Sequence, residues 1–200
     1  MSTFTPTNAT QETASVSTAK QEQAPRFSLD ALTRTLTSLE SAPTQSELDA
    51  LLRKLELEPE ELRGHLNFKP NTYTRHRLFR SDLCEMLVLC WLPGHRTAIH
   101  DHNGSYGAIR ICEGAMEEEI FALNEAGEVE FQTMHLRAAG EVTGTDVPDI
   151  HRIGNPEQMA ERMITIHVYA PPLRVINTYQ LGSAEVGECW PDDPANPANG

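Results

Sequence analysis

Three histidines have the residue type and spacing of metal ligands. His100 and His102 are two residues apart in a strand-like run, so both imidazoles project from one face, while Asp101 between them points to the other. Two adjacent imidazoles can hold one metal ion, and a third ligand must then come from another strand. His151, which follows a turn signal, is the best candidate. Because an isolated His-x-His pair is usually a pair of surface histidines, the surrounding sequence decides between the two interpretations.

A second polar group lies in the segment 163–169. Its period of two places Thr165, His167 and Tyr169 on one face and the aliphatic residues between them on the other. A hydroxyl, an imidazole and a phenol in a row can form a hydrogen-bonded relay in which His167 orients Tyr169. A polar face turned to solvent would give the same pattern, so the pattern alone leaves a relay and a plain surface open.

Tyr73 and Arg75 form a similar same-face pair at the start of the strand-rich region. An arginine on a strand is usually a solvated surface charge. If Arg75 pointed inward it would require an anionic partner, and a substrate carboxylate is one such partner.

The elements that must position these residues are helical first and then β. Leucines spaced three and four apart predict helices between about 28 and 66, with a capping box at Thr44 and Glu47 and a helix start at Pro59. From Tyr73 onward, short runs rich in Val, Ile and aromatic residues are separated by turn residues, which predicts an antiparallel sandwich or barrel. The predicted strands are 73–79, 83–92, 96–102, 107–112, 115–122, 128–136, 149–154 and 162–170.

Composition narrows the class of protein. The formal net charge of −13 opposes binding to nucleic acid or to an anionic membrane surface. The chain has four cysteines without a Cys-x-x-Cys pair, no apolar run long enough to cross a bilayer, and no apolar signal-peptide core. We expect a cytoplasmic, monomeric protein, with a weak oligomer as the alternative. Residues 1–26 and 191–200, poor in large apolar side chains, are predicted to be disordered tails around a single domain at 27–190.

The glycine and histidine spacing resembles the first cupin motif. The residues that stand at the spacing of the motif are Gly94, His100, His102, Gly107 and Gly114. The chain departs from the motif at Gly107, where a metal-binding glutamate is common, and a proline before His151 with Asn155 after it matches part of the second motif. The resemblance covers 73–172 and implies a mainly β fold: a small cupin barrel, or double-stranded β-helix, preceded by a short helical segment.

Four groups together resemble the cysteine dioxygenase family. They are His100-Asp-His102, His151-Arg, Tyr73-Thr-Arg75 and the run from Thr165 to the Pro-Pro pair after Tyr169. The resemblance implies that the three histidines hold one Fe(II) per chain and that Arg75, with Tyr73 beside it, receives the carboxylate of cysteine. It also implies catalytic roles for Tyr169, His167 and Thr165, the last at a position where the family usually has serine.

Gly107 is the larger departure from that family. Animal members have a cysteine there, joined by a thioether to the tyrosine that matches Tyr169, whereas bacterial members often have glycine. Cys112 lies an odd number of residues away, on the opposite face of its strand. We therefore expect no Cys-Tyr thioether. Three neutral imidazoles without a carboxylate leave the full charge of the metal ion on the site, which favours anionic ligands such as thiolates.

The activity implied is oxidation of L-cysteine by O2 to cysteine sulfinic acid, so the partners are a small thiol and O2. Three alternatives stay open. Another small thiol such as 3-mercaptopropionate could be the substrate, although enzymes for that thiol look to have glutamine in place of Arg75. The chain could also be a metal-dependent cupin enzyme of another class, such as an isomerase using zinc or manganese, or a non-catalytic metal-binding cupin that holds a small ligand.

Overall fold

The computed structural model describes residues 26–145, 150–193 and 195–198, so the predicted N-terminal tail lies outside the described residues apart from Arg26. Helices α1 (Leu29–Thr37), α2 (Gln45–Lys54) and α3 (Pro59–Arg63) confirm the helical segment. Ser28 caps α1, Thr44 and Glu47 form the predicted capping box of α2, and Pro59 begins α3. None of the described helices has the length and apolar character needed to span a bilayer.

The rest of the described chain is mainly β-structure. The strands are β1 (Thr74–Arg80), β2 (Glu85–Trp91), β3 (Ile99–Asp101), β4 (Tyr106–Glu113), β5 (Ala115–Leu123), β6 (Val129–Ala138), β7 (Val142–Thr145), β8 (Ile150–Gly154), β9 (Met163–Ala170), β10 (Ile176–Tyr179) and β11 (Val186–Cys189). They form a five-stranded sheet in the order β1-β2-β9-β4-β7 and a six-stranded sheet in the order β11-β10-β3-β8-β5-β6. Every predicted strand is present, and the four-residue strands β7, β10 and β11 are additional.

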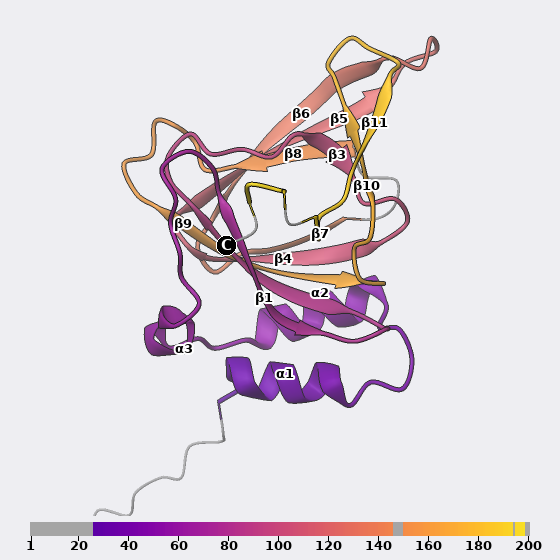
Figure 1. Ribbon diagram of the computed structural model, residues 1–200. Coiled ribbons are helices and arrows are strands. Elements are labelled where there is room, and N and C mark those ends of the chain that lie inside the picture. The colour runs from indigo at the N-terminus through magenta and orange to yellow at the C-terminus, as the bar shows by residue number, and fades with distance from the viewer. Residues whose placement is uncertain (1–25, 146–149, 194, 199–200) are drawn as a thin grey trace, which may run out of the picture.

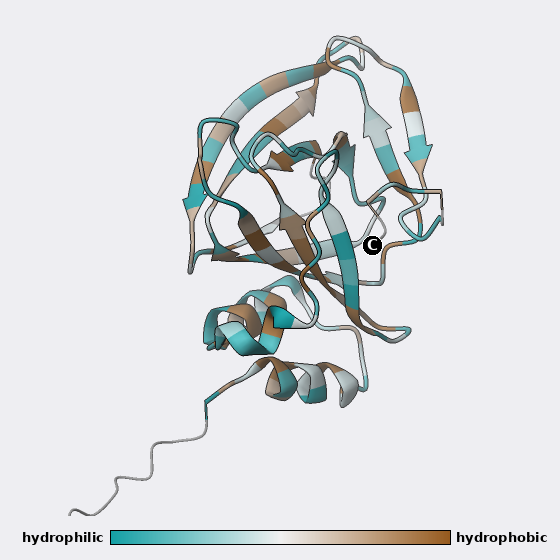
Figure 2. Ribbon diagram, turned by 60° about the vertical axis from the view of Figure 1, so that its left-hand side comes forward, coloured by the Kyte–Doolittle hydropathy of each residue, from teal (hydrophilic) through white to brown (hydrophobic). Residues whose placement is uncertain are grey.

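The two sheets face each other as a small cupin barrel, and the helices cover the outer face of the five-stranded sheet (Figure 1). In Figure 2 the strands above the helices are hydrophobic along much of their length. One core joins the leucines of α1 and α2 to outward residues such as Val88 and Ile166. A second core lies inside the barrel and contains residues of both sheets, such as Leu87 and Ile153.

Strand β9 is buried along its whole length because it lies between β2 and β4 and is covered on both faces. Its aliphatic residues pack in the core under the helices, whereas Tyr169 packs in the core inside the barrel. The face that carries Thr165, His167 and Tyr169 therefore points into the barrel and is not a solvent-exposed surface.

Strand β1 contains a β-bulge between Arg77 and Phe79. Arg75 pairs with Leu89 and Arg77 pairs with Leu87, so both arginines share the inward face of that pair of strands. Because a bulge shifts the alternation by one residue, Arg80, which pairs with Glu85, faces the same way. Three arginines thus lie along one inner edge of the barrel.

The C-terminal end differs from the expected disordered tail. Residues 190–193 and 195–198, which we call the C-terminal strap, run back across the barrel next to β1 (Figure 1). The carbonyl of Ala198 accepts a hydrogen bond from the Arg75 amide at 2.7 Å, and Ala198 is buried. The polar residues that suggested a tail instead form turns, because Asp193 and Asn196 accept hydrogen bonds from backbone amides two residues ahead.

Candidate metal centre

Three buried imidazoles meet at one end of the barrel interior. His100 on β3 pairs directly with His151 on β8, and His102 follows β3 by one residue. One ring nitrogen of each lies within 4.8 Å of the others, and the ring centroids are 4.7–5.1 Å apart. Among the described residues this is the only cluster of three or more potential ligands with such geometry. The arrangement confirms that His151 joins the His-x-His pair.

The outer nitrogens of the cluster are held so that the inner ones face one another. His100 Nδ1 lies 2.9 Å from the carbonyl of Ala98, and His151 Nδ1 lies 3.3 Å from the buried carboxylate of Glu118. With Nδ1 as the donor in both, Nε2 keeps its lone pair for a metal. The Nε2 atom of His151 is buried and makes no hydrogen bond within the described chain. These residues fit a divalent metal ion.

Electrostatics favours the same assignment. Burial and the neighbouring imidazoles lower the pKa of His100 well below its ordinary value, which keeps the ring neutral and able to act as a ligand. Burial alone would raise the pKa of Glu118, but hydrogen bonds from His151 and Arg137 outweigh it and lower the pKa to about 2. Glu118 is thus an anion behind a neutral ligand, whereas Asp101 faces away and accepts hydrogen bonds from Asn177 and Tyr179.

The polar residues of β9, Thr165, His167 and Tyr169, form a hydrogen-bonded relay, which was one of the two interpretations that their spacing left open. Thr165 Oγ1 lies 2.8 Å from His167 Nε2, and His167 Nδ1 lies 2.9 Å from the hydroxyl of Tyr169. Trp91, which the sequence analysis did not single out, donates its indole N–H to Thr165 Oγ1 at 3.0 Å. All four side chains are buried.

The direction of this relay follows from two facts: the indole of Trp91 can only donate, and His167 Nε2 is the acceptor that the described residues offer to the buried hydroxyl proton of Thr165. Thr165 accepts a hydrogen bond from Trp91 and donates its O–H to Nε2 of His167. The other ring nitrogen of His167, Nδ1, then carries the hydrogen and donates to the oxygen of Tyr169. The phenol proton of Tyr169 is then directed away from His167. Burial, the charge of Arg75 and the histidines of the cluster lower the pKa of His167 well below its ordinary value, in agreement with this neutral tautomer.

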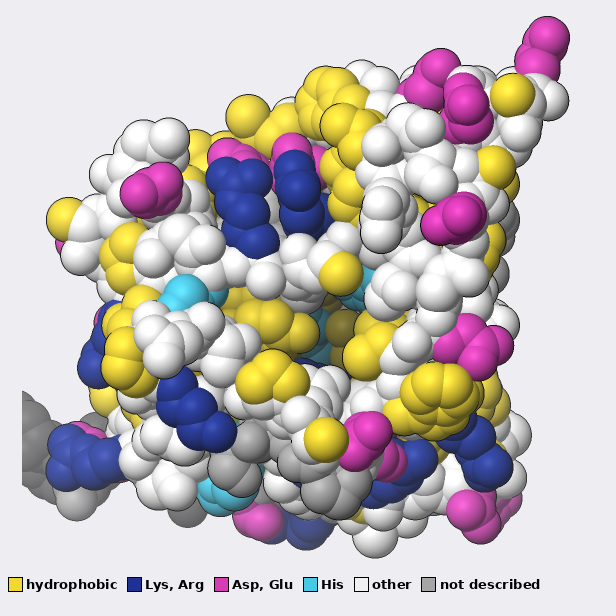
Figure 3. Space-filling view, turned by 45° about the horizontal axis from the view of Figure 1, so that its top comes forward, with side chains coloured by type: hydrophobic (Ala, Val, Ile, Leu, Met, Phe, Trp, Pro, Cys, Tyr) yellow, Lys and Arg dark blue, Asp and Glu magenta, His cyan; other side chains and the backbone are white. Residues whose placement is uncertain are grey.

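Most of the predicted site residues line one small cavity of about 60 Å³. Those on its wall are Tyr73, Arg75, His100, His102, His167 and Tyr169. Thr165 and His151 stand behind this wall. Tyr73 stacks on Trp91 with the rings 4.4 Å apart, and burial raises the pKa of Tyr73. Figure 3 shows this face of the molecule hollowed, with histidine side chains inside the hollow.

Several wall residues had no signal in the sequence. Leu87, Leu89 and Leu173 provide an apolar lining, and Cys189, Pro191 and Asn196 come from β11 and the C-terminal strap. Arg75 Nη1 donates a hydrogen bond to the carbonyl of Pro191 at 2.9 Å. Nothing in the composition of the strap distinguishes a segment that closes a cavity from a solvated tail.

Gly107 on β4 pairs directly with Tyr169 on β9. A Cβ atom at residue 107 would lie 2.6 Å from Cδ1 of the tyrosine ring, closer than real Cβ atoms approach their neighbours. The absence of a side chain at Gly107 therefore leaves the space that the phenol ring of Tyr169 occupies. Cys112 packs in the core under the helices, on the other side of the sheet from Tyr169, as its odd offset predicted.

Comparisons with known proteins identify one family among the relatives of this chain. The family model described as Cysteine dioxygenase type I matches residues 20–181. The curated proteins named Cysteine dioxygenase type 1 from Homo sapiens and Rattus norvegicus are each 26% identical over 137 residues, covering 66% of this chain and 68% of theirs. The Danio rerio protein of that name is 22% identical over 143 residues, with the same coverage.

Solved structures with double-stranded β-helix domains are also similar. One from Klebsiella pneumoniae is 16% identical with a TM-score of 0.44, covering 64% of this chain and 93% of its own. An RmlC-like cupin family protein from Methanocaldococcus jannaschii is 20% identical with a TM-score of 0.41, covering 52% and 87%. The family match is the broader finding, since it spans the helices, β1 to β10 and all three clustered histidines. This chain belongs to the cysteine dioxygenase type I family.

Proposed function

We propose that this protein is an iron-dependent dioxygenase that converts L-cysteine and O2 into cysteine sulfinic acid. The observation that carries the proposal is a cationic side chain, Arg75, on the wall of the same small cavity as the three-imidazole cluster. A metal centre and a fixed guanidinium suit a short substrate with a thiol at one end and a carboxylate at the other. The names of the curated relatives support the same substrate.

When bound by His100, His102 and His151, Fe(II) supplies open coordination positions at which a thiolate and O2 can meet. Both oxygen atoms of O2 end on the substrate sulfur, so the reaction needs no external reductant. The outer hydrogen bonds of His100 and His151 keep the ligands in place before any metal arrives.

The remaining groups act on the substrate. Arg75 binds the carboxylate through guanidinium N–H groups that Pro191 does not use. Tyr169, oriented by His167, donates its phenol proton toward the substrate and stabilises negative charge that develops on oxygen. The leucines of the cavity wall limit the access of water to the reacting sulfur. Tyr73 fills the space beside Arg75 and, by stacking on Trp91, links the substrate wall to the relay.

In this proposal the protein acts as a monomer in the cytoplasm. The chain acts as one domain in which the predicted range of 27–190 is extended by the strap, and a monomer is sufficient because every proposed site residue comes from one chain. All four cysteines are free thiols, which fits the reducing cytoplasm.

Anaerobic reconstitution with Fe(II), followed by O2 consumption with a panel of thiols, tests the function. We expect L-cysteine to give one sulfinate per O2 consumed, with the product identified by mass spectrometry. Preference for 3-mercaptopropionate would replace cysteine by another thiol acid. Metal analysis that finds zinc or manganese with no O2 uptake would indicate another cupin enzyme class, and a metal-loaded protein inert to all the thiols would indicate a non-catalytic cupin.

A further inference from the structure

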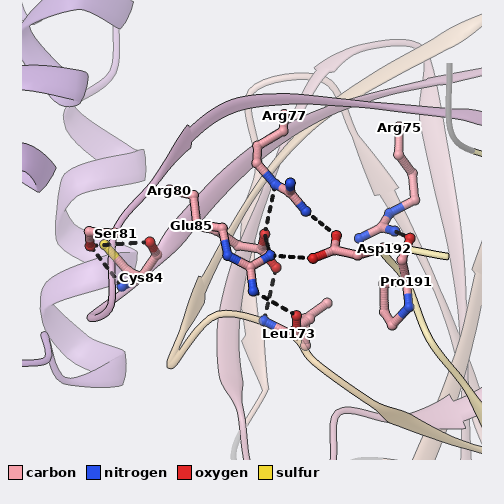
Figure 4. A network of polar contacts seen from close by, with 9 residues as sticks. All are labelled: Arg75, Arg77, Arg80, Ser81, Cys84, Glu85, Leu173, Pro191 and Asp192. Carbon is pink, nitrogen blue, oxygen red and sulfur yellow. Dashed lines mark hydrogen bonds and ion pairs between the residues drawn. The ribbon is translucent and has the colours of Figure 1, made fainter. Parts of the chain in front are cut away.

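The C-terminal strap is tied to the barrel by a compact group of four charged side chains (Figure 4). Glu85 on β2 is fully buried and accepts hydrogen bonds from Arg77 Nε and Arg80 Nη1, each at 3.2 Å. Asp192 of the strap accepts from Arg80 Nη1 at 2.7 Å and also from Arg77 Nη2. Two guanidinium groups thus stand between two carboxylates, and the group as a whole is neutral.

The four charged residues are also connected to two parts of the cavity wall. The other oxygen of Glu85 accepts a hydrogen bond from the amide of Leu173 at 2.9 Å, and Leu173 lines the cavity. Asp192 follows Pro191, whose carbonyl accepts a hydrogen bond from Arg75 Nη1. A guanidinium is planar and has five N–H donors, so one fixed donor defines its plane and leaves the others for a ligand.

We propose that Asp192 is a positioning residue for substrate recognition. By joining Arg77 and Arg80 it fastens the strap to Glu85, and the fastened strap holds the Pro191 carbonyl against Arg75. The orientation of Arg75 toward a substrate carboxylate is then set by an ion pair outside the cavity. The identity of the substrate rests on the proposed function, whereas the fastening of the strap does not.

A merely stabilising surface ion pair would affect all substrates alike, so the test compares two thiols. In Asp192→Asn we expect the KM for cysteine to rise about fivefold, which is the upper range for a partly exposed ion pair. The kcat for cysteine should stay near the wild-type value, and cysteamine, which lacks the carboxylate, should show an unchanged KM. Asp192→Glu, which keeps the charge, should restore much of the affinity for cysteine.

Glu188→Gln is the matched control. Glu188 is an exposed acidic residue on β11, four residues before Asp192, and it forms no ion pair with the described part of the chain. The control variant loses the same charge and should behave as wild type. Equal changes in KM for cysteine and cysteamine, or equal effects of the Asp192 and Glu188 variants, would overturn the proposal.

A second measurement tests the strap without any catalysis. Cys189 lines the cavity, and Asn196 of the strap donates to its sulfur at 3.9 Å. Cys84 and Cys90 are buried, and burial raises the pKa of Cys112 to about 12, so Cys189 is the thiol best placed for alkylation. In the iron-free protein, iodoacetamide should modify Cys189 about fivefold faster in Asp192→Asn than in wild type, in proportion to the weakened ion pair.

Peptide mapping by mass spectrometry assigns the modified cysteine, and Glu188→Gln again serves as the control. Unchanged alkylation in Asp192→Asn would show that the ion pairs do not hold the strap and would overturn the proposal even if the enzyme oxidises cysteine. Faster alkylation of Asp192→Asn, combined with a wild-type protein that oxidises no thiol, would support the attachment of the strap by Asp192. It would contradict the proposed substrate and the proposed function.

Discussion

Two of the three clustered histidines are held from behind by different groups, a backbone carbonyl for His100 and a buried carboxylate for His151. The carboxylate of Glu118 is itself paired with Arg137 at 2.8 Å, so it stays ionised without entering the metal cluster. A negative charge one hydrogen bond away from the ring makes the imidazole a stronger electron-pair donor to a metal ion. The site thus obtains part of the effect of a carboxylate ligand while all its inner ligands are neutral.

Replacing any one of these histidines by alanine should abolish both iron retention and thiol oxidation, because two imidazoles are too few to hold the ion. We expect His151→Ala to contain less than about a tenth of the wild-type iron after desalting, since even the loss of a hydrogen-bond partner of a ligand typically costs roughly 10–100-fold in metal affinity. Iron is measured by elemental analysis. His135→Ala, an exposed histidine on β6, is the control, and full iron content with activity in His151→Ala would exclude that residue as a ligand.

Arg75→Ala should weaken the use of cysteine far more than the use of cysteamine. A charge-assisted contact in a partly desolvated cavity contributes roughly 2–5 kcal/mol, so kcat/KM for cysteine should fall about 30-fold or more. The measurement is steady-state O2 consumption with both thiols. An equal loss for the two would mean that Arg75 maintains the fold of the cavity and does not bind the carboxylate.

Between neighbouring strands, the contact of Gly107 on β4 with the Tyr169 ring on β9 is the most sensitive point. Gly107→Ala inserts a methyl group 2.6 Å from the ring, so the ring must move or the strands must separate. We expect a loss of about 1–3 kcal/mol in stability, as for other overpacked sites, together with a lower kcat. Gly64→Ala, which meets no atom within 4 Å, is the control, and a wild-type kcat in Gly107→Ala would contradict the role given to the ring position.

The residue that lies opposite Tyr169 on β4 also determines whether a thioether to the tyrosine can form. Since Gly107 has no sulfur, the wild-type chain should have the mass of its unmodified sequence after turnover with iron and O2. Gly107→Cys could form a thioether, with loss of two hydrogens, once the ring has moved to admit the new side chain. Intact-mass analysis with peptide mapping is the measurement. A loss of two hydrogens in the wild-type protein, mapped to Tyr169 and a cysteine, would overturn this expectation.

The periodicity and spacing of apolar residues were sufficient to predict where the long helices and strands lie. The heptad-like leucines located α1 and α2, and alternation located β9 together with the side chains that share its inward face. The pattern could not decide whether that face was buried, because this depends on the strand lying centrally in a covered sheet. Strands β10 and β11 and the C-terminal strap were missed because they are short and polar, and their order comes from pairing and turns rather than from apolar periodicity.

Across the whole molecule, the five-stranded sheet separates two cores that serve different purposes. The core under the helices has no part in the cavity, whereas the core inside the barrel surrounds it. The family resemblance located the histidine cluster, but only the three-dimensional structure showed that Trp91 and the strap complete the site. A side chain two residues away on a strand is predictable from sequence, while a contact between β1 and a segment more than 100 residues later is not.

Leu48→Ala should therefore destabilise the protein without changing its chemistry. Leu48 on α2 is fully buried in the core under the helices, and truncation of such a leucine costs about 2–5 kcal/mol. Denaturant unfolding should show this loss, while kcat and KM of the folded fraction stay at wild-type values. Leu123→Ala, at a leucine that is 53% exposed, should alter neither quantity. A large change in KM in Leu48→Ala would mean that the two cores are coupled through the sheet.

The bulge in β1 determines which face of the strand carries Arg80, so the presence of the arginine alone does not place it in the four-charge group. Deleting Leu78 would remove the extra residue and leave an unbroken ladder, in which Arg80 still pairs with Glu85 and still faces the inside of the barrel. A relative that has two residues between the same arginines but no bulge would turn the second arginine to the helix side, and we expect it to lack the four-charge group. An alignment of this family should therefore be read for the spacing between the arginines together with the bulge, rather than for the presence of the arginines alone.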